Sequence, residues 1–590
     1  MPAVSFSATE IRGLAPSLDV RGLDSPVVTD GRNIVLDSDG IRSAFGAELL
    51  DSAPVKSTVG TQGVALDIEE SNRSIVMFDN WMGEWDGVRG TWIPRAFFTS
   101  TVARPHRWTK AFVNGFVFLC HPVVGILWLN AETNEVGQLN VPGLPALPVA
   151  IAQNQGRLIV MNDAFLTWSA QSNGFDFTPQ IGGPGFQLIN DRVPGRPLMI
   201  ASVARGVLTW TTRGLMFSEF TGALEVYRHR AVNTTFRPVN SFCVQAFSGQ
   251  QGQQIENDSV VILDRRGLFQ TDGGLLRPFA PDFNEFLIER FKRIHFLEFS
   301  NLRLEWHEEF QHLYLCESVT DRSDTYTRSW VYYPPLGKWG SFDATHRGLF
   351  PVRISRGAMR GNWMAYHAKS DNRLRLLRRV PHVKNIPITL GTNLVRRGWR
   401  ETAVNGGRSV VTLRMATSAE IESLSSADGY FTHDFAGKAP LEKMSLDATA
   451  TVGVFKLSAG EVISRLSEIH NVLIGSLTAR SDLVPEEDFL VPMEGVEDMD
   501  YDVLSGAEDF GVAPYTTVSY SLELLSSFDG MTVATKTTPY LEDFHPTAQL
   551  FSAFQPGVWH AFRINATKPG ETFQLKWVEF QGILSGRHRS

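Results

Sequence analysis

The sequence predicts a mainly β protein whose central part is a β-propeller. Five times between roughly residues 110 and 345, an apolar strand-like run is followed by a turn and by a second strand that carries an aromatic residue. The copies lie roughly 40 to 55 residues apart, a period typical of propellers and solenoids. An aromatic content of 11% favours a β-rich fold, and 590 residues are too many for one hydrophobic core.

Each copy is predicted to be a hairpin from its own residues. In the third copy, Val207, Thr209 and Thr211 alternate with apolar neighbours, and an Arg-Gly pair then marks a turn. About six or seven such units over residues 58–382 would close a propeller ring, whereas a generic β-sandwich of about 100 residues would need fewer. The clear copies begin at Asn114, Gln155, Arg205, Asp258 and Gln311, and weaker ones begin at Arg73 and Arg356.

Two segments around the repeats differ from them in pattern. Residues 1–57 contain few long apolar runs and many turn-forming residues, which predicts an extended N-terminal arm lying on its own propeller or on a neighbouring subunit. After Pro281, Phe286, Leu287 and Phe291 recur at helical spacing, and we expect a short helix between blades.

No membrane-spanning segment is expected, because the uncharged stretch from 111 to 131 is split by polar residues, Gly and Pro.

Arginines concentrate where the composition changes, between residues 372 and 400. We expect the main domain boundary here, with the propeller ending at 382. Such a run is usually a solvated face or a contact between subunits, and contact with DNA phosphates is the less favoured interpretation. The candidate subunit-contact or lumen-facing residues are Arg373, Arg375, Arg378, Arg379, Arg396, Arg397 and Arg400.

Residues 383–590 are predicted to form a C-terminal β-sandwich or mixed α+β domain. Val462, Leu466 and Ile469 share one face at helical spacing, which predicts a helix over 460–475. The alternation around Phe573 and Leu575 predicts a final hairpin within 559–587. An acidic loop is expected over 485–510, because about ten acidic residues and no basic one lie between Glu486 and Asp509.

Charge and cysteine content restrict the class of protein. A net charge of −8 argues against a protein that wraps nucleic acid by neutralising phosphates. Cys120, Cys243 and Cys316 each lie in an apolar run, so we expect small buried side chains in a reducing compartment, not disulfides or a metal site.

Motifs that resemble catalytic or metal sites fail on spacing. His307 and His312 are five residues apart, one more than a zinc-binding helix face requires. Residues 37–40 lack the remaining ligands of a calcium loop and read as a turn, and the glycines of 182–185 read as a loop between blades. A glycosidase could still draw on two distant carboxylates, for which Asp176, Asp264 and Glu309 are equal candidates. We therefore predict no catalytic residue, cofactor or metal site.

Both ends of the chain and several repeats resemble one family. The segments are DGRNIVLDSDGIRSAFG (30–46), LTWS (166–169) with FDF (175–177), TWTTRGL (209–215) and WHAFRINATKPGETFQLKWVEFQGILSGR (559–587). They resemble the tail nozzle or hub proteins of short-tailed bacteriophages, also called tail tubular protein B, over most of the chain. The long acidic segment and the larger C-terminal domain depart from the shorter members.

The resemblance implies a structural virion protein without catalytic residues. About six copies would form a ring below the portal and the tail adaptor, as the distal tail tube through which DNA leaves, and a head-to-tail contact could close such a ring. The implied partners are the adaptor, tail fibres or spikes, tail-tip proteins and, transiently, viral DNA. The implied location is the virion tail, assembled in the host bacterial cytoplasm. Two alternatives stay open: a carbohydrate-active or carbohydrate-binding propeller, and a scaffold for protein partners, although the Trp-Asp signature of such scaffolds is missing.

Overall fold

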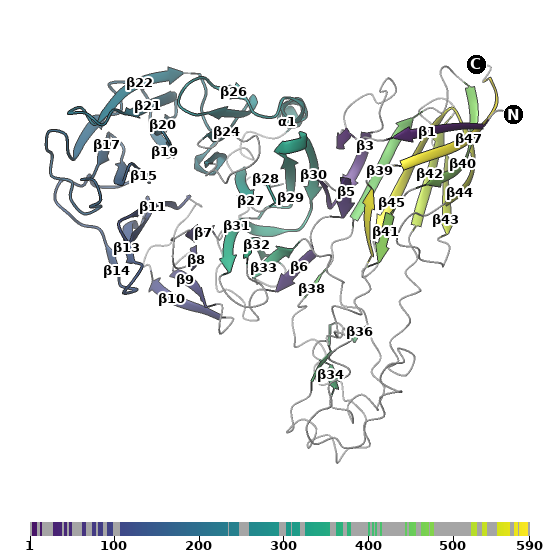
Figure 1. The fold of residues 1–590 in the computed structure, drawn as a ribbon, viewed down its shortest axis with the longest axis horizontal. Helices are drawn as coiled ribbons and strands as arrows, with labels where there is room; N and C mark the ends of the chain where they lie inside the picture. Colours follow the sequence, from purple (N-terminus) through teal and green to yellow (C-terminus); the bar gives the residue numbers. More distant parts are fainter. Residues whose placement is uncertain are drawn as a thin grey trace, which may run out of the picture. The chain divides into compact units, whose positions relative to one another are not determined.

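The computed structural model divides into two compact units (Figure 1). The propeller unit consists of Ala53–Trp339 and Asp343–Arg375, and the terminal unit of Met1–Ser52, Gly340–Phe342 and Leu376–Ser590. The structure describes residues 107–233, 235–246, 259–293, 302–307, 310–318, 325–354, 361–369, 374–378 and 551–566, and elsewhere the strands named below.

The described strands of the propeller unit form seven antiparallel sheets in chain order. The first blade consists of β7 (Gln62–Leu66), β8 (Arg73–Met77), β9 (Trp81–Asp86) and β10 (Thr91–Phe97); the second of β11 (Thr109–Val113), β12 (Phe116–His121), β13 (Gly125–Asn130) and β14 (Val136–Gln138); and the third of β15 (Ala150–Asn154), β16 (Arg157–Met161), β17 (Phe165–Trp168) and β18 (Gly185–Leu188). The fourth consists of β19 (Pro197–Val203), β20 (Gly206–Thr211), β21 (Gly214–Phe220) and β22 (Tyr227–Asn233); the fifth of β23 (Val244–Ala246), β24 (Val260–Asp264), β25 (Gly267–Thr271) and β26 (Arg277–Pro278); the sixth of β27 (Arg303–His307), β28 (His312–Glu317), β29 (Arg328–Tyr333) and β30 (Lys338–Phe342); and the seventh of β31 (His346–Ile354), β32 (Gly361–Ala368) and β33 (Leu374–Arg378). The last three residues of β30 and of β33 belong to the terminal unit.

The seven sheets close into a ring. The first strand of each sheet contacts the first strand of the next, from β11 to β15 and onward to β31. β31 in turn contacts β7 of the first sheet (Figure 1), and one apolar cluster joins the first and second sheets. This is a seven-bladed β-propeller, which confirms the predicted fold class and the predicted six or seven blades.

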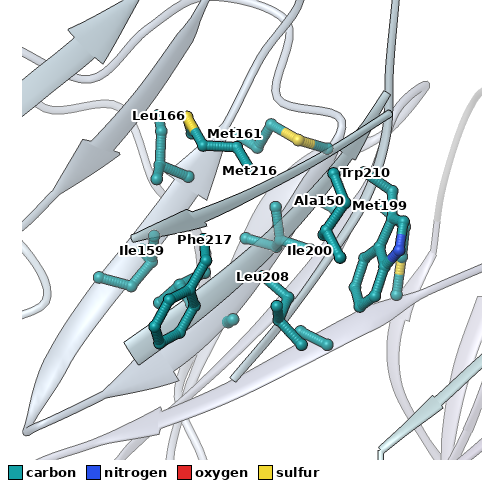
Figure 2. Packing of buried hydrophobic residues seen from close by; sticks show 14 of the residues in the cluster. Ala150, Ile159, Met161, Leu166, Met199, Ile200, Leu208, Trp210, Met216 and Phe217 are labelled. Carbon is teal, nitrogen blue, oxygen red and sulfur yellow. The ribbon is translucent and has the colours of Figure 1, made fainter. Parts of the chain in front are cut away.

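Side chains alternate between the two neighbours of each blade. On β16, Leu158 and Val160 pack into the cluster shared with the preceding blade, whereas Ile159 and Met161 pack into the cluster shared with the following blades. Figure 2 shows part of the second cluster, in which Trp210 is completely buried. Because both faces of a blade are covered, its middle strands read as uninterrupted apolar runs.

Two-residue turns set the register inside the blades. Val113 pairs with Phe116 across the turn Asn114-Gly115, whose φ angles are 46° and 81°. Gln155-Gly156, with φ angles of 50° and 69°, joins β15 to β16 in the same way. Two successive positive φ angles give a hairpin turn whose twist matches the strands, and glycine adopts the second without strain.

The predicted helix between blades is confirmed. α1 (Pro281–Arg293) follows β26 and buries Phe283, Leu287 and Phe291. The amide of Asn284 on this helix bonds both ways with the backbone of Leu268 on β25, at 2.6 and 3.0 Å, and so fixes the helix to the fifth blade.

In the terminal unit, strands from the two ends of the chain pair with each other. β1 (Ala3–Ala8) pairs with β47 (Val578–Arg587), β3 (Val27–Arg32) with β39 (Ala448–Phe455), and β5 (Gly40–Ser43) with β46 (Glu571–Leu575). The segment predicted as an arm thus contributes strands to the same sheets as the C-terminal residues.

The other described strands of this unit are β2 (Arg12–Leu14), β4 (Ile34–Asp37), β6 (Gly46–Leu49), β34 (Trp399–Glu401), β35 (Val404–Asn405), β36 (Arg408–Ser409), β37 (Leu413–Met415), β38 (Lys443–Met444), β40 (Val462–His470), β41 (Leu473–Ser476), β42 (Ser521–Ser527), β43 (Ala534–Pro539), β44 (Phe551–Gly557) and β45 (Trp559–Ala566).

The predicted helix over 460–475 is wrong. Its residues form β40, which pairs with β44 and β47, and β41, which pairs with β46. The register of β40 shifts between Leu466 and Glu468 against both neighbours. A bulge inserts one residue into the two-residue alternation, and this produces the spacing of Val462, Leu466 and Ile469 that resembles a helical stripe.

The predicted final hairpin is also wrong, although its strands exist. β45 pairs with β39 and β42, β46 with β5 and β41, and β47 with β1 and β40. Alternating residues identify strands, but they do not identify partners that come from the other end of the chain.

Candidate functional site

Arg107 spans the centre of the propeller. It lies two residues before β11 in the second blade, yet its guanidinium donates hydrogen bonds to the carbonyl oxygens of Phe242 (3.3 Å) and Val244 and to the side-chain oxygen of Gln245 (2.8 Å). These acceptors lie at the start of β23 in the fifth blade or just before it. The two blades are not neighbours in the ring, so these bonds cross its centre.

A buried ion pair lies on the inner strand of the sixth blade. Arg303 Nε is 2.6 Å from Glu305 Oε1, and the two side chains are 2% and 5% exposed. A second guanidinium nitrogen of Arg303 donates to the carbonyl of Leu349 on β31 at 2.6 Å, which links two blades.

Burial lowers the pKa of Arg107, and the charge of Glu305 partly offsets this effect. Burial also opposes the charged form of Arg303, but Glu305, Tyr326 and Cys316 outweigh it and raise its pKa.

His346 continues the polar centre into the last blade. Its Nε2 lies 3.1 Å from Ser329 Oγ, and its ring stacks on Tyr326 with 5.3 Å between centroids. Burial, with the charges of Arg303 and His367, lowers the pKa of His346 to about 3. The imidazole is therefore neutral near pH 7 and fixed by its neighbours, which suits a structural polar network more than proton transfer.

Where the structure describes them, the carboxylates considered for glycoside hydrolysis make other contacts. Among the described inner strands β7, β11, β15, β19, β23, β27 and β31, Glu305 is the one carboxylate, and Arg303 neutralises it. Asp264 accepts bonds from Arg266 (2.8 Å) and from the backbone of Arg237 (3.1 Å), and Asp176 accepts from the backbone of Thr178. Glu309 lies outside the described residues. Hydrolysis needs two carboxylates roughly 5 to 10 Å apart on either side of one bond.

The three cysteines are small buried side chains, as the sequence predicts. Cys120, Cys243 and Cys316 are free thiols. Burial raises the pKa of Cys120, and it raises the pKa of both Cys243 and Cys316 to about 12. Within the part of the chain that the structure describes, no cluster of His, Cys, Asp or Glu could hold a metal ion. No helix in that part is long and apolar enough to cross a membrane.

Two rejected motifs lie in hairpins and a third in a loop. His307 and His312 face each other across the β27–β28 hairpin, which confirms strands in place of a zinc-binding helix. Asp37 pairs with Gly40 across the turn between β4 and β5, as expected of a turn. Residues 182–184 end the connection from β17 to β18, which begins at Gly185, so the predicted place between blades is wrong. The long connection between these two strands resembles a link between blades in sequence.

The arginine cluster is only partly described. Arg375 lies on β33 and is 2% exposed, so its predicted role in a subunit contact or a lumen is wrong, because its own chain encloses the side chain. Arg378 and Arg400 lie on β33 and β34, for which the structure gives the strand but not the side chain. The other candidates, Arg373, Arg379, Arg396 and Arg397, lie outside the described residues.

The sequence did not point to Arg107, Arg303 or Glu305. The one available signal was the alternation of charged and apolar residues in Leu302–His307, which is unusual among apolar repeats. The sequence pattern gives no indication that Arg107 contacts the fifth blade, because that contact depends on closure of the ring.

No protein-family model matches this chain, and no curated protein matches it in sequence. Solved structures similar to part of it include YCF48 bound to D1 peptide, with 10% identity and a TM-score of 0.33 over 55% of this chain and 94% of that one. Another is U3-55K, with 9% identity and a TM-score of 0.33 over 56% and 98%. The β-propeller domain of Cps50 (Swd1) from Myceliophteria thermophila has 8% identity and a TM-score of 0.32 over 56% and 98%.

Proposed function

We propose that this protein is a structural component of a short-tailed phage virion, the nozzle or hub at the distal end of the tail tube. The proposal depends on the resemblance of segments at both ends of the chain. One observation supports it most: these distant segments pair in one sheet, with Ile41 opposite Leu575 and Arg42 opposite Gln574. Segments that resemble one family at opposite ends are thus parts of one folded unit.

The propeller suits a rigid building block. Arg107 connects opposite blades across its centre, and the Arg303–Glu305 pair is enclosed there. Both groups make structural bonds, which supports a fixed centre. The proposed role is that of a non-enzymatic part of the particle.

The proposed assembly is a ring of about six copies below the tail adaptor, with fibres or spikes and tail-tip proteins attached. DNA would pass through the ring of subunits. A net charge of −8 fits this role, because each phosphate that a conduit neutralises adds a salt-dependent attraction that slows passage.

Electron microscopy and mass measurement of the purified full-length chain test this proposal. We expect closed rings with a mass about six times the 65.7 kDa of one chain. Labelling of particles with an antibody against the chain should mark the tip of the tail. A strictly monomeric chain across the accessible concentration range, together with unlabelled tails, would contradict the proposal. Glycan cleavage that is abolished in Glu305→Gln, in a chain that still folds, would favour the carbohydrate alternative.

A further inference from the structure

A hollow of about 500 Å³ lies where the third and fourth blades of the propeller meet. Its lining residues are polar apart from one glycine: Asp163, Asn190, Gly195, Arg196, Thr212 and Arg213. The first two adjoin strands of the third blade, and the other four adjoin strands of the fourth. Ligand sites are commonly concave and of this size. The polar lining selects against an apolar ligand, because such a ligand would bury little apolar surface here.

Hydrogen bonds hold the two arginine segments of the hollow together. The backbone N–H of Arg196 donates to Thr212 Oγ1 at 3.0 Å, and the N–H of Thr212 donates to the carbonyl of Arg196 at 2.8 Å. The φ angle of Gly195 is 108°, and a Cβ there would lie 2.7 Å from Thr212 Oγ1 and 3.1 Å from Cγ of Arg213. Glycine permits both the φ angle and the close approach. The two arginine side chains therefore start from neighbouring points on a fixed backbone.

A fixed turn presents the carboxylate that lines the hollow. The side-chain oxygen of Asn162 accepts bonds from the backbone N–H groups of Ala164 and Phe165, at 2.9 and 2.6 Å. Between them, Asp163 Oδ1 lies 3.9 Å from Arg196 Nε, and the two side chains are 64% and 77% exposed. An exposed pair at this distance contributes little to stability. Both groups therefore keep most of their hydrogen-bonding capacity for a ligand.

Positive charge is in excess around the hollow. The exposed guanidinium of Arg213 has no hydrogen-bond or ion-pair partner in the part of the chain that the structure describes. Arg237 donates to the carbonyl of Thr212 at 3.1 Å, which places a third guanidinium beside the same turn. Asp264, which accepts from the backbone of Arg237, is already paired with Arg266. Like charges held close together repel each other unless an anion balances them, so this arrangement favours a bound anion.

The lining also restricts the class of anion. Guanidinium groups bind carboxylate and phosphate oxygens through pairs of parallel hydrogen bonds. The hollow is larger than one inorganic anion fills, and Asp163 and Asn190 offer oxygens that can accept bonds from hydroxyl groups. No aromatic side chain lies among the lining residues to stack on a base, which disfavours a nucleotide. An acidic sugar supplies both the oxyanion and the hydroxyl groups.

We propose that this hollow binds an acidic saccharide. The carboxylate or phosphate of the sugar lies between Arg196 and Arg213, and its hydroxyl groups donate to Asp163 and Asn190. Each contact is exposed and contributes little alone, so the affinity for a single sugar is weak and decreases as the salt concentration rises. This binding goes beyond the proposed tail function and is independent of the size of any ring.

Saturation-transfer NMR with the full-length chain tests the site. Glucuronate, glucose 6-phosphate and glucose are the probes, and inorganic phosphate is the competitor. We expect transfer to glucuronate, to glucose 6-phosphate or to both, which identifies the preferred oxyanion, and none to glucose. Displacement should need at least about tenfold more phosphate than sugar, because phosphate lacks the hydroxyl contacts. No transfer to either acidic sugar, equal transfer to glucose, or displacement by equimolar phosphate would overturn the proposal.

Neutral substitutions test the role of the arginines. Arg196→Gln combined with Arg213→Gln should weaken binding of the acidic sugar about tenfold or more, because it removes the charged hydrogen bonds. Arg228→Gln, at an exposed side chain on β22 of the same blade, is the matched control and should leave binding unchanged. Unaltered circular dichroism confirms that each variant folds. Unweakened sugar binding by the double variant would contradict the proposal. A labelled DNA duplex that binds the original chain but not the double variant, without any binding of acidic sugars, would identify a nucleic-acid surface instead.

Asp163→Ala tests the contact with the hydroxyl groups. Loss of this carboxylate strengthens the attraction of the hollow for every anion, so inorganic phosphate should compete at lower concentrations. The acidic sugar also loses a hydroxyl acceptor, so its affinity relative to that of phosphate should decrease about threefold or more. An unchanged ratio of the two affinities would show that the sugar hydroxyls do not contact Asp163, and the assignment to a saccharide would be wrong.

Discussion

The two units of this protein use strands in opposite ways. In the propeller, strands that follow each other in the chain pair with each other, as in the order β15-β16-β17-β18. In the terminal unit the sheets have the orders β1-β47-β40-β44 and β2-β3-β39-β45-β42-β43, which join the two ends of the chain. Local pairing has a low entropic cost of loop closure, whereas pairing across hundreds of residues has a higher cost and forms more slowly.

Because of this difference, we expect a substitution in a blade core and a substitution in an end-to-end sheet to destabilise different sets of strands. Blades share their faces, so the loss of one core side chain affects its neighbours in the ring. In the terminal unit, a central strand holds segments from both ends in place. Hydrogen exchange measured separately for peptides of each unit can distinguish these effects, because it reports local and global opening.

The largest effect is expected from Trp210→Ala in the propeller. Trp210 is completely buried between blades, and removal of a buried Trp side chain costs about 3–5 kcal/mol. Hydrogen exchange should become much faster in peptides of the propeller and should change less in peptides of the terminal unit. Phe186→Ala, at a side chain that is 57% exposed, is the control and should change stability by less than about 0.5 kcal/mol.

The next effect concerns the terminal unit. Leu466→Pro places proline in β40, which pairs on both sides, with Gln555 of β44 and Gly582 of β47. Proline removes a ladder hydrogen bond and leaves its acceptor unpaired, which should cost about 1–3 kcal/mol. Faster exchange should spread to β1, which is held by β47, while the blades stay protected. Protection that stays unchanged in β1 would show that the two ends are less coupled than the sheet order implies.

A loss of similar size is expected from Arg107→Ala. The substitution removes charged hydrogen bonds to the fifth blade and leaves the carbonyl of Phe242 and the Gln245 side chain without this donor. A hydrogen bond of a charged group contributes about 1.5–3 kcal/mol. Denaturant unfolding should show this decrease, and Arg228→Ala, at an exposed side chain on β22, should show almost none. Equal effects of the two substitutions would argue against a link across the ring.

Near neutral pH the smallest effect is that of His346, which contributes a pH dependence of stability only below about pH 6.5. Its pKa in the folded chain is about 3, lowered from 6.5, so the unfolded chain takes up a proton that the folded chain does not. This contribution to stability is complete above pH 6.5 and decreases as the pH falls towards about 3, by at most about 1.4 kcal/mol per pH unit for one proton. His346→Asn should flatten this part of the profile in urea titrations at a series of pH values, whereas an unchanged slope would assign it to other groups.

Local patterns in the sequence were sufficient to predict the blades. The runs that start at Asn114, Gln155 and Arg205 correspond to β12–β13, β16–β17 and β20–β21, because each hairpin carries its own turn and its own apolar strands. The same reasoning predicted α1 and the buried cysteines. These features depend on neighbours within about twenty residues, and that range is visible in a sequence.

Tertiary structure alone decided the pairing of the two ends, the strand in place of the helix at Val462–His470, and the meeting of Arg107 with Gln245. In each case the pairing partners lie more than eighty residues away in the chain, and in β40 a bulge also disguised the alternation. The periodicity of apolar residues shows which side chains become buried, but it does not show which elements pack over them. The sequence by itself therefore determined the repeated unit of this protein, and ring closure and end-to-end pairing decided what its centre and its termini became.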